Sequence, residues 1–414
     1  MGLFKKQTTS LAGIDYTSTS LIEYDGWVAA QYKNMSVRVS TNLLETSIDN
    51  SNTFSTSLVT SLGDSVLSAY IYDNGNILLT TDDNKLYLTN INLTSLVEKI
   101  CLDTDGVTPY LPHTPVNSSF PGRYFYSTKY ISDNDATTMH VFANYCNVVA
   151  GAAPVAIYYT TDFGETVKVA YKFGQNLVYG DDGTSNGSSS GTLLGDATNT
   201  DIRTRHTHAV EYDAENDKWY CLTGDTIWTF TTPDMEENQW VEGTYTEETD
   251  SWVWSALDFG FVIPQTSRLK ATECFFYDGY VYWSSDATNV PLDNTENGIW
   301  RSPIDTFTDI TTHQKLFSMP NYDDVITTLK LDTNTKTIVG AFATNNSNPI
   351  NGIYAAKEYG AGEVDFHYVS TDYNLIRLNS INEEGYFRWD TELSNETKTT
   401  TLFLKIGEDL FNNL

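Results

Sequence analysis

The most informative stretch of the chain is residues 203–234, where apolar and polar positions follow the two-residue period of a β-strand. Two sets of side chains alternate along its first strand: His206, His208, Val210 and Tyr212 on one face, and Thr207, Ala209 and Glu211 on the other. A polar turn at 213–217 precedes an apolar strand at 218–222, and Gly224-Asp225 precedes a third strand at 226–230. The pattern predicts most of a four-stranded antiparallel unit.

The same pattern recurs along the chain, with an apolar strand that ends in Tyr-Asp or Leu-Asp and is followed by another apolar strand. The copies end at Tyr24-Asp25, Tyr72-Asp73, Tyr212-Asp213, Tyr277-Asp278 and Leu331-Asp332. A second repeated element is predicted to open the third strand of a unit, at 297–300 and 351–354, with looser versions at 156–158 and 226–228. The spacing of roughly 45 to 80 residues is at or above the upper end for blade-type repeats. These repeats predict an all-β chain that forms a single β-propeller of four-stranded antiparallel blades.

We expect seven blades, and their predicted starts lie near Leu21, Leu67, Tyr124, His206, Ala271, Val325 and Leu375. Six blades are the alternative if the terminal segments share one blade, an arrangement that closes the ring and removes exposed strand edges. The predicted limits are an N-terminal segment at 1–14, the propeller at 15–406 and a C-terminal tail at 407–414. The low-complexity segment 180–200 is too polar to add to a core and is predicted to be an inter-blade loop.

One local motif is more specific than the strand pattern. Residues 160–166, Thr-Thr-Asp-Phe-Gly-Glu-Thr, match the pattern Ser/Thr-x-Asp-x-Gly-x-Thr. Here the chain resembles the sialidase-like propellers with BNR repeats, or Asp boxes. The resemblance implies that Thr160 and Asp162 bind backbone amides of a hairpin, that Gly164 has a positive φ and that Thr166 completes the box. Val167 stands where that family usually has Trp. Degenerate versions occur at 232–234, 302–305 and 370–374.

The resemblance speaks to fold, because Asp boxes lie on blade hairpins away from the ligand face, so function has to be argued from a site. A sialidase needs a cluster of arginines, an acid/base Asp and a Tyr/Glu nucleophile pair. None of the arginines lies in the Phe/Tyr-Arg-Ile-Pro motif that opens the sialidase family; they are Arg38, Arg123, Arg203, Arg205, Arg268, Arg301, Arg377 and Arg388. Catalytic residues are not identifiable, and a hydrolase or lyase that uses paired carboxylates stays open as the alternative.

The first candidate ligand-binding position is the strand that carries His206 and His208, with Arg203 and Arg205 nearby. Two imidazoles at i and i+2 can bind a ligand or a metal, but no third ligand can be identified, so no metal site is predicted. The competing interpretation is that internal hydrogen bonds occupy these histidines. No cofactor is expected; Ca²⁺ is the weaker alternative, because the loops at 133–135 and 213–217 lack the full spacing of a calcium loop.

Charge and targeting signals exclude several classes of partner. The chain has 24 basic and 54 acidic residues and a net charge of −30, which repels phosphate backbones and anionic membranes, so no nucleic-acid partner is expected. Neither a secretory h-region nor a run of ~20 apolar residues occurs, so we expect synthesis in the cytoplasm without a signal peptide and no membrane insertion. The four cysteines, Cys101, Cys146, Cys221 and Cys274, show no CxxC pairing and are expected to be buried.

The composition, rich in Thr, Asn, Ser and Tyr, acidic and without a signal, resembles virion proteins of tailed bacteriophages. The predicted function is therefore a non-enzymatic structural or glycan-binding propeller in a virion, in a tail, fibre or head appendage. Its expected partners are other virion proteins or further copies of itself, with a host-surface glycan as a further candidate. Five tryptophans are candidate platforms for stacking on sugar rings, with core packing as the competing interpretation: Trp27, Trp252, Trp254, Trp283 and Trp389.

Overall fold

In the computed structural model of the 414-residue chain, most of the described residues lie in β-strands, which are joined by turns and short 3-10 helices. It describes residues 3–6, 9–11, 14–16, 20–25, 27–40, 43–49, 53–59, 66–81, 85–110, 123–132, 138–145, 155–174, 196–199, 202, 204, 207–224, 239–260, 267–285, 296–319, 324–333, 336–344, 352–357, 366–370, 375–381, 387–393 and 397–405. No helix within these ranges is both long and apolar enough to cross a membrane. The predicted all-β class is confirmed.

The strands fall into two compact units. Unit 1 contains Met1–Val59 and Thr272–Leu414, and unit 2 contains Thr60–Ala271. Unit 2 therefore forms from one continuous segment, whereas unit 1 brings the two ends of the chain together.

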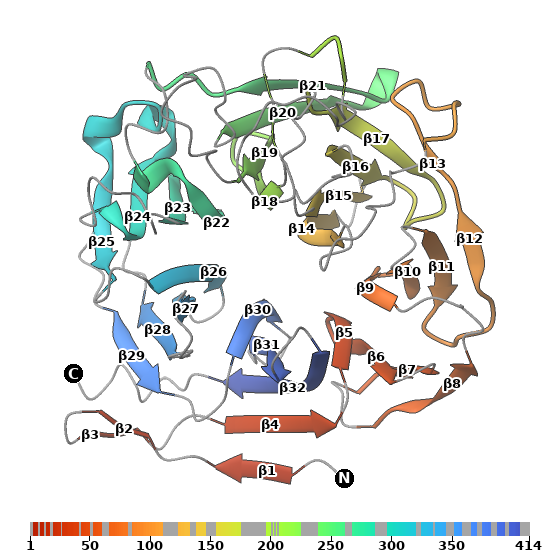
Figure 1. Cartoon of the computed structure of the whole chain (residues 1–414), viewed down its shortest axis with the longest axis horizontal. Helices are drawn as coiled ribbons and strands as arrows, with labels where there is room; N and C mark the ends of the chain where they lie inside the picture. The colour runs from red at the N-terminus through yellow and green to blue at the C-terminus, as the bar shows by residue number, and fades with distance from the viewer. Residues whose placement is uncertain are drawn as a thin grey trace, which may run out of the picture. The chain divides into compact units, whose positions relative to one another are not determined.

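Unit 2 contains three sheets, which are antiparallel except for one added strand in the second (Figure 1). The first consists of β9 (Val66–Ile71), β10 (Asn76–Thr81), β11 (Leu86–Asn90) and β12 (Val97–Lys99). The second consists of β14 (Arg123–Ser132), β15 (Thr138–Tyr145), β16 (Ala156–Thr160) and β17 (Val167–Lys172), with β13 (Cys101–Leu102) added in parallel to β17. The third consists of β18 (Thr207–Asp213), β19 (Lys218–Thr223), β20 (Trp240–Thr246) and β21 (Ser251–Ala256).

Unit 1 contains three four-stranded sheets. The first consists of β5 (Trp27–Tyr32), β6 (Met35–Ser40), β7 (Leu43–Ser47) and β8 (Ser55–Val59). The second consists of β22 (Ala271–Tyr277, the boundary strand), β23 (Tyr280–Ser285), β24 (Gly298–Pro303) and β25 (Gln314–Ser318). The third consists of β26 (Asp324–Asp332), β27 (Thr337–Thr344), β28 (Gly352–Lys357) and β29 (His367–Ser370).

The last sheet of unit 1 joins the two ends of the chain. Its strands, in spatial order, are β1 (Leu3–Lys6), β4 (Ser20–Asp25), β32 (Thr397–Lys405), β31 (Phe387–Leu393) and β30 (Leu375–Ile381). Strand β4 pairs antiparallel with β32, and β1 extends the sheet beyond β4 (Figure 1). The segment 1–14 thus contributes one strand to this sheet, and β2 (Thr9–Leu11) pairs with β3 (Ile14–Tyr16) in a separate hairpin.

Six of the seven predicted starts fall within one residue of the first strand of a sheet, at β9, β14, β18, β22, β26 and β30. The seventh, near Leu21, corresponds to β4, which belongs to the closing sheet, while the next four-stranded sheet begins at Trp27. The terminal segments therefore share one sheet. The described residues nevertheless form seven sheets of four or five strands, which is consistent with the preferred blade number.

The third strand expected at 226–230 needs a correction. Strand β19 pairs with β20, so the third strand of that sheet is Trp240–Thr246, and residues 226–230 lie outside the described part of the chain. The apolar run at 226–230 gave the wrong third strand because a β-branched and aromatic segment indicates a strand but does not show which strand it pairs with. The third strands predicted at 156, 298 and 352 are confirmed as β16, β24 and β28.

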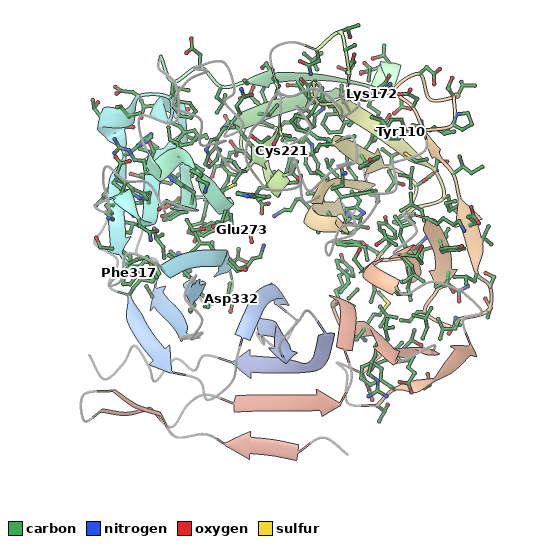
Figure 2. The ribbon with its side chains drawn as sticks, viewed as in Figure 1. Tyr110, Lys172, Cys221, Glu273, Phe317 and Asp332 are labelled. Atoms are coloured by element: carbon green, nitrogen blue, oxygen red, sulfur yellow. The ribbon has the colours of Figure 1, made fainter. Side chains whose placement is uncertain are left out.

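The described core clusters lie between successive sheets of each unit, and strands β10, β16, β19 and β23 are buried along almost their whole length; their side chains are drawn in Figure 2. Along β15 the side chains alternate between two clusters: Val141 packs toward the sheet that begins at β18, and Phe142 packs toward the sheet that begins at β9. Each fully buried apolar side chain of this kind contributes about 1.5–3 kcal/mol of transfer free energy. In unit 1, Phe275 and Ile326 belong to one cluster between two sheets.

Candidate functional site

The predicted ligand position on β18 is represented by His208, because His206, Arg203 and Arg205 lie outside the described residues. The His208 side chain is buried, with 8 % of the residue exposed, and its Nδ1 lies 2.7 Å from the Ala271 carbonyl oxygen. Nδ1 is therefore the protonated nitrogen in the neutral tautomer, since only an N–H can donate to a carbonyl. A backbone hydrogen bond occupies this ring nitrogen.

Charged residues on the first strands pair between neighbouring sheets. In unit 2, Lys129 on β14 forms an ion pair with Glu211 on β18. In unit 1, Lys330 on β26 donates to Glu273 on β22 at 2.9 Å. Both glutamates are buried, which makes a partner necessary because an uncompensated buried charge is strongly destabilising. Each unit thus has a buried glutamate that forms an ion pair with a lysine of the neighbouring sheet.

A second polar network surrounds His140 of β15. Tyr72 Oη lies 2.8 Å from His140 Nδ1, Thr128 Oγ1 hydrogen bonds to Nε2, and Tyr70 stacks on the ring at 4.0 Å between centroids. Tyr130 donates to Asp73 beside this group. Burial lowers the pKa of His140 well below its usual value and raises that of Tyr72, so the imidazole is neutral.

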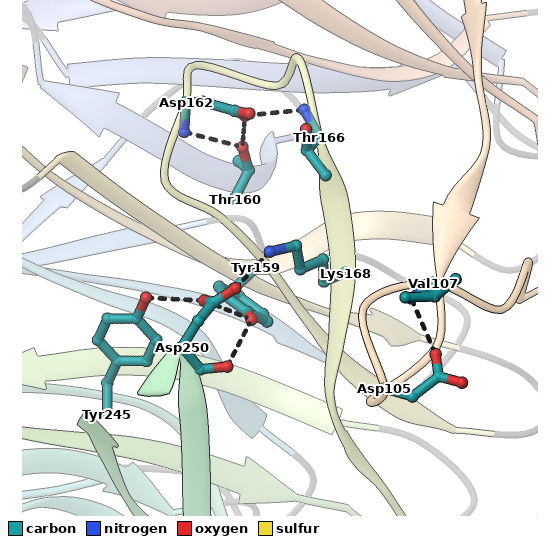
Figure 3. A network of polar contacts seen from close by, with 9 residues as sticks. All are labelled: Asp105, Val107, Tyr159, Thr160, Asp162, Thr166, Lys168, Tyr245 and Asp250. Carbon is teal, nitrogen blue, oxygen red and sulfur yellow. Dashed lines mark hydrogen bonds and ion pairs between the residues drawn. The ribbon is translucent and has the colours of Figure 1, made fainter. Parts of the chain in front are cut away.

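Residues 160–166 form a tight turn between β16 and β17 (Figure 3). The Thr160 hydroxyl donates to Asp162 Oδ1 at 2.9 Å and accepts from the Gly164 amide at 3.0 Å, while the Thr166 amide donates to Asp162 Oδ1 at 2.8 Å. Phe163 and Gly164 both have positive φ, and a Cβ on Gly164 would lie 3.0 Å from the Tyr72 ring. The hydrogen bonds of Thr160, Asp162 and Thr166 stabilise the turn.

A matching set of hydrogen bonds follows β7 and was not predicted from the sequence. The Ser47 hydroxyl donates to Asp49 Oδ1 at 2.6 Å, and the Thr53 amide donates to the same oxygen at 2.9 Å. The spacing Ser47-x-Asp49-x-x-x-Thr53 equals that of Thr160, Asp162 and Thr166, but Ser51 replaces the glycine. Searching for the hydroxyl–Asp–Thr spacing without requiring glycine would have found it. Of the degenerate versions, 232–234 and 371–374 lie outside the described residues, and Ser302 binds the Thr312 hydroxyl instead.

A polar and aromatic group in unit 2, termed here the Asp250 cluster, consists of Tyr159, Lys168, Tyr245, Asp250, Trp252 and Trp254. Asp250 Oδ1 accepts from the hydroxyls of Tyr159 and Tyr245, each at 2.8 Å, and Oδ2 accepts from Lys168 (Figure 3). Asp250 has a left-handed backbone, and its amide donates to the Glu247 carbonyl oxygen. A turn between β20 and β21 thus binds side chains of β16 and β17.

The two tryptophans of the cluster point to the same side of β21 because they are two residues apart. Their rings stack at 5.2 Å with an interplanar angle of 20°, and Trp252 also contacts Tyr159 and Tyr245. Both indole Nε1 atoms are buried and have no hydrogen-bond acceptor among the described residues. On the opposite side of the strand, Val253 is 72 % exposed.

The electrostatics of the cluster favour a fixed charge rather than proton transfer near neutral pH. Burial would raise the pKa of Asp250, but the hydrogen bonds from Lys168, Tyr245 and Tyr159 hold it below the usual value. Burial, together with the Asp250 carboxylate, raises the pKa of Tyr159 and of Tyr245. Asp250 therefore stays ionised and both phenols stay neutral over the physiological range.

Comparison with known proteins gives matches of fold only. No known protein family matches the sequence, and no curated protein matches it either. An ancestral GH74 enzyme has a similar structure, with a TM-score of 0.52 and 13 % identity over 98 % of this chain, which spans about half (51 %) of that enzyme's chain. YCF48 from Cyanidioschyzon merolae matches over 96 % of this chain and 98 % of its own, with 11 % identity and a TM-score of 0.49. The matched structures are β-propeller-like.

The fold is a β-propeller. Each four-stranded sheet described above is thus a blade of the propeller, and the sheet shared by β4 and β32 is the blade in which the chain ends meet. At these levels of identity the matches say nothing of activity.

The other residues singled out from the sequence are tryptophans, cysteines and two acidic loops, and only some of them lie in the described part of the chain. Trp283 is fully buried, so core packing applies to it, whereas the side chains of Trp27 and Trp389 lie outside those described. Cys101, Cys221 and Cys274 are buried thiols, as predicted, and Cys146 is not among the described residues. Of the two candidate calcium loops, the one at 213–217 is described: the Asp213 carboxylate accepts hydrogen bonds from the Glu215 amide and the Asn216 side chain and so stabilises its own turn. The other, at 133–135, lies outside the described residues. Within the described ranges, no three His, Cys, Asp or Glu residues are grouped as metal ligands.

Proposed function

We propose that this propeller is a non-enzymatic structural or glycan-binding component of a virion of a tailed bacteriophage. The observation that carries the proposal is the pairing of charged residues on the first strands, Lys129 with Glu211 and Lys330 with Glu273. Each pair joins the first strands of neighbouring blades, so these buried carboxylates already have structural partners.

The described carboxyls with a shifted pKa are all ionised near neutral pH. A glycosidase needs one carboxylic acid whose pKa is raised toward neutrality, so that it can protonate the leaving group. The described carboxyls with a shifted pKa, Asp49, Asp105, Asp196, Asp250 and Asp309, are all shifted downward, and each one accepts hydrogen bonds that stabilise its charged form. These groups suit turn formation and ligand contact.

The virion part of the proposal rests on composition and on the resemblance of residues 160–166 to an Asp box of the sialidase-like propellers. The resemblance to phage virion proteins lies in the acidic character of the chain and in its many Thr, Asn, Ser and Tyr residues. The expected partners are other virion proteins, further copies of this chain or a host-surface glycan, and the product is incorporated into a particle after synthesis in the cytoplasm.

The alternative function is a glycoside hydrolase or lyase that acts on a surface polysaccharide. It is favoured by the structural similarity to an enzyme of the GH74 type, although that similarity concerns the fold. The two functions differ in one measurable respect, because only the enzyme releases products.

The test is to incubate the purified chain with a panel of bacterial and mucosal glycans and to score retention and mass-detected cleavage in the same wells. Retention without cleavage is the expected result. Cleavage that is lost in the His206→Ala/His208→Ala double variant overturns the proposal in favour of the hydrolase or lyase. If no glycan is retained, the glycan part fails and the structural role is tested by co-sedimentation with assembled particles.

A further inference from the structure

We infer that the Asp250 cluster of unit 2 is a contact site for a neutral, hydroxyl-rich saccharide. The inference rests on the proposed function, since it assigns to the glycan-binding role a location and a class of sugar. Neither the motif at residues 160–166 nor the histidine strand points to this position.

The indole rings of the two tryptophans of the cluster expose carbon atoms only. Trp252 and Trp254 are half-buried, yet the Nε1 atoms have no solvent exposure, so the accessible part of each indole ring is carbon. The two rings stack on each other and pack against the core cluster of unit 2, and the carbon that stays accessible is an apolar surface that suits the C–H face of a pyranose. Small-molecule sites combine such surfaces with a few fixed polar groups.

Asp250 and Lys168 supply accessible polar groups in the same cluster. The Asp250 side chain is 41 % exposed and that of Lys168 is 23 % exposed, so both remain accessible while bonded to each other. A carboxylate has about four acceptor sites and an ammonium has three donors. Asp250 Oδ2 accepts from Lys168, and Oδ1 accepts the two phenols, which leaves Oδ2 and Lys168 with capacity for the hydroxyls of a sugar.

The Asp250 carboxylate is held in place by its protein partners. Tyr159, Tyr245 and Lys168 come from three different strands and all bind the one carboxylate, so its position is set before any ligand arrives. The left-handed conformation of Asp250 and its amide bond to Glu247 fix the turn as well. Groups that are already ordered lose less conformational entropy on binding.

Charge selects the class of sugar. Lys168 and Asp250 neutralise each other, so the site offers no net positive charge to a carboxylated or phosphorylated saccharide. The net charge of −30 on the chain repels polyanions at long range. A neutral saccharide interacts through its hydroxyls and C–H faces. It needs no positive charge at the site, and the negative charge of the chain does not repel it.

The test uses the intact chain and compares neutral oligosaccharides built from glucose, galactose or mannose with sialylated and uronate-containing ones of equal length. Tryptophan fluorescence and saturation-transfer NMR report binding. The expected result is a saturable change with a neutral series. Asp250→Asn and Trp254→Ala should weaken binding by about tenfold each, the loss that corresponds to one stacking or charge-assisted contact. Val253→Ala, on the opposite side of the same strand, should leave binding unchanged.

Lys168→Gln is the second variant, because a surface lysine on β17 can be replaced without removing a packed ring. Circular dichroism verifies the fold of every variant. Saccharide binding that is unchanged in folded Asp250→Asn and Lys168→Gln overturns this site and leaves the glycan-binding function standing. Preference for the acidic series overturns the assigned class. A wild-type chain that binds no saccharide by either method overturns the glycan-binding function together with the site.

Discussion

Gly243 on β20 lies directly opposite Trp254 on β21, and a Cβ at Gly243 would come within 2.6 Å of the indole ring. The absence of a side chain at Gly243 lets the Trp254 ring lie over the β20 backbone. The position of the tryptophan pair therefore depends on a glycine in the neighbouring strand.

Gly243→Ala should destabilise the propeller by about 1–3 kcal/mol, because the Trp254 ring has to move out of its packed position. Urea unfolding measures the loss, and near-UV circular dichroism should report the displaced indole. Gly340→Ala is the matched control: its Cβ would lie 3.4 Å from Ile299 Cδ1, a contact that needs little movement. Equal stability losses in the two variants would contradict the packing argument.

Asp162→Ala should destabilise the 160–166 turn by about 1 kcal/mol, because it leaves the Thr166 amide and the Thr160 hydroxyl without their acceptor. Asp49→Ala should cost a similar amount, since Asp49 accepts from Ser47 and Thr53 in the same way. Thermal denaturation measures both losses. Thr161→Val, at the exposed position between Thr160 and Asp162, is the control and should be close to neutral.

The pairing of Lys330 with Glu273 should give a measurable coupling energy, about 1 kcal/mol in a double-mutant cycle of Lys330→Met and Glu273→Gln. The reason is burial, since the Glu273 side chain is only 9 % exposed. The cycle on Lys99 and Glu165, whose glutamate side chain is 57 % exposed, should give a smaller coupling, because solvent screens an exposed pair. A larger coupling for the exposed pair would refute this explanation.

The buried His140 should make stability pH-dependent on the acid side. Burial lowers its pKa in the folded state, so below about pH 6.5 the unfolded chain binds a proton that the folded chain does not. Stability from this group is therefore complete above about pH 6.5 and is lost as the pH falls. His140→Gln should flatten this part of the pH profile, measured by urea unfolding between about pH 7 and about pH 5. The wild-type chain and the His140→Gln variant share the other groups around the ring, which include Tyr70, Tyr72, Tyr130 and Asp73.

Ile22→Pro should destabilise the closing blade more than Phe4→Pro does. Ile22 lies on β4, between Phe4 of β1 and Phe403 of β32, whereas Phe4 lies on the edge strand. Proline has no amide hydrogen to donate, and sheets accept it at edges rather than in central strands. Hydrogen exchange of β31 and β32 amides measures the effect. Equal protection in both variants would show that β4 contributes little to the closure.

Strand positions could be predicted to a large extent because each first strand combines β-branched or aromatic residues with a polar turn after it. Strands β22 and β30 begin at the predicted residues Ala271 and Leu375. The Asp250 cluster was predicted only in part. Trp252 and Trp254 were candidate platforms, but Tyr159 is 91 residues from Asp250 along the chain. No local spacing relates residues so far apart.

The sequence by itself determined the local features: the β-strands, their starts and the 160–166 turn, whose hydrogen bonds join residues no more than four positions apart. Tertiary structure decided which strand pairs with β19 and which sheet covers each face of β15, where Val141 and Phe142 enter different clusters. It also placed Tyr159, Lys168 and Tyr245 around Asp250. The physical reason is that strand propensity and turn chemistry depend on neighbouring residues, whereas the partner of a buried face depends on which sheet the rest of the chain places against it.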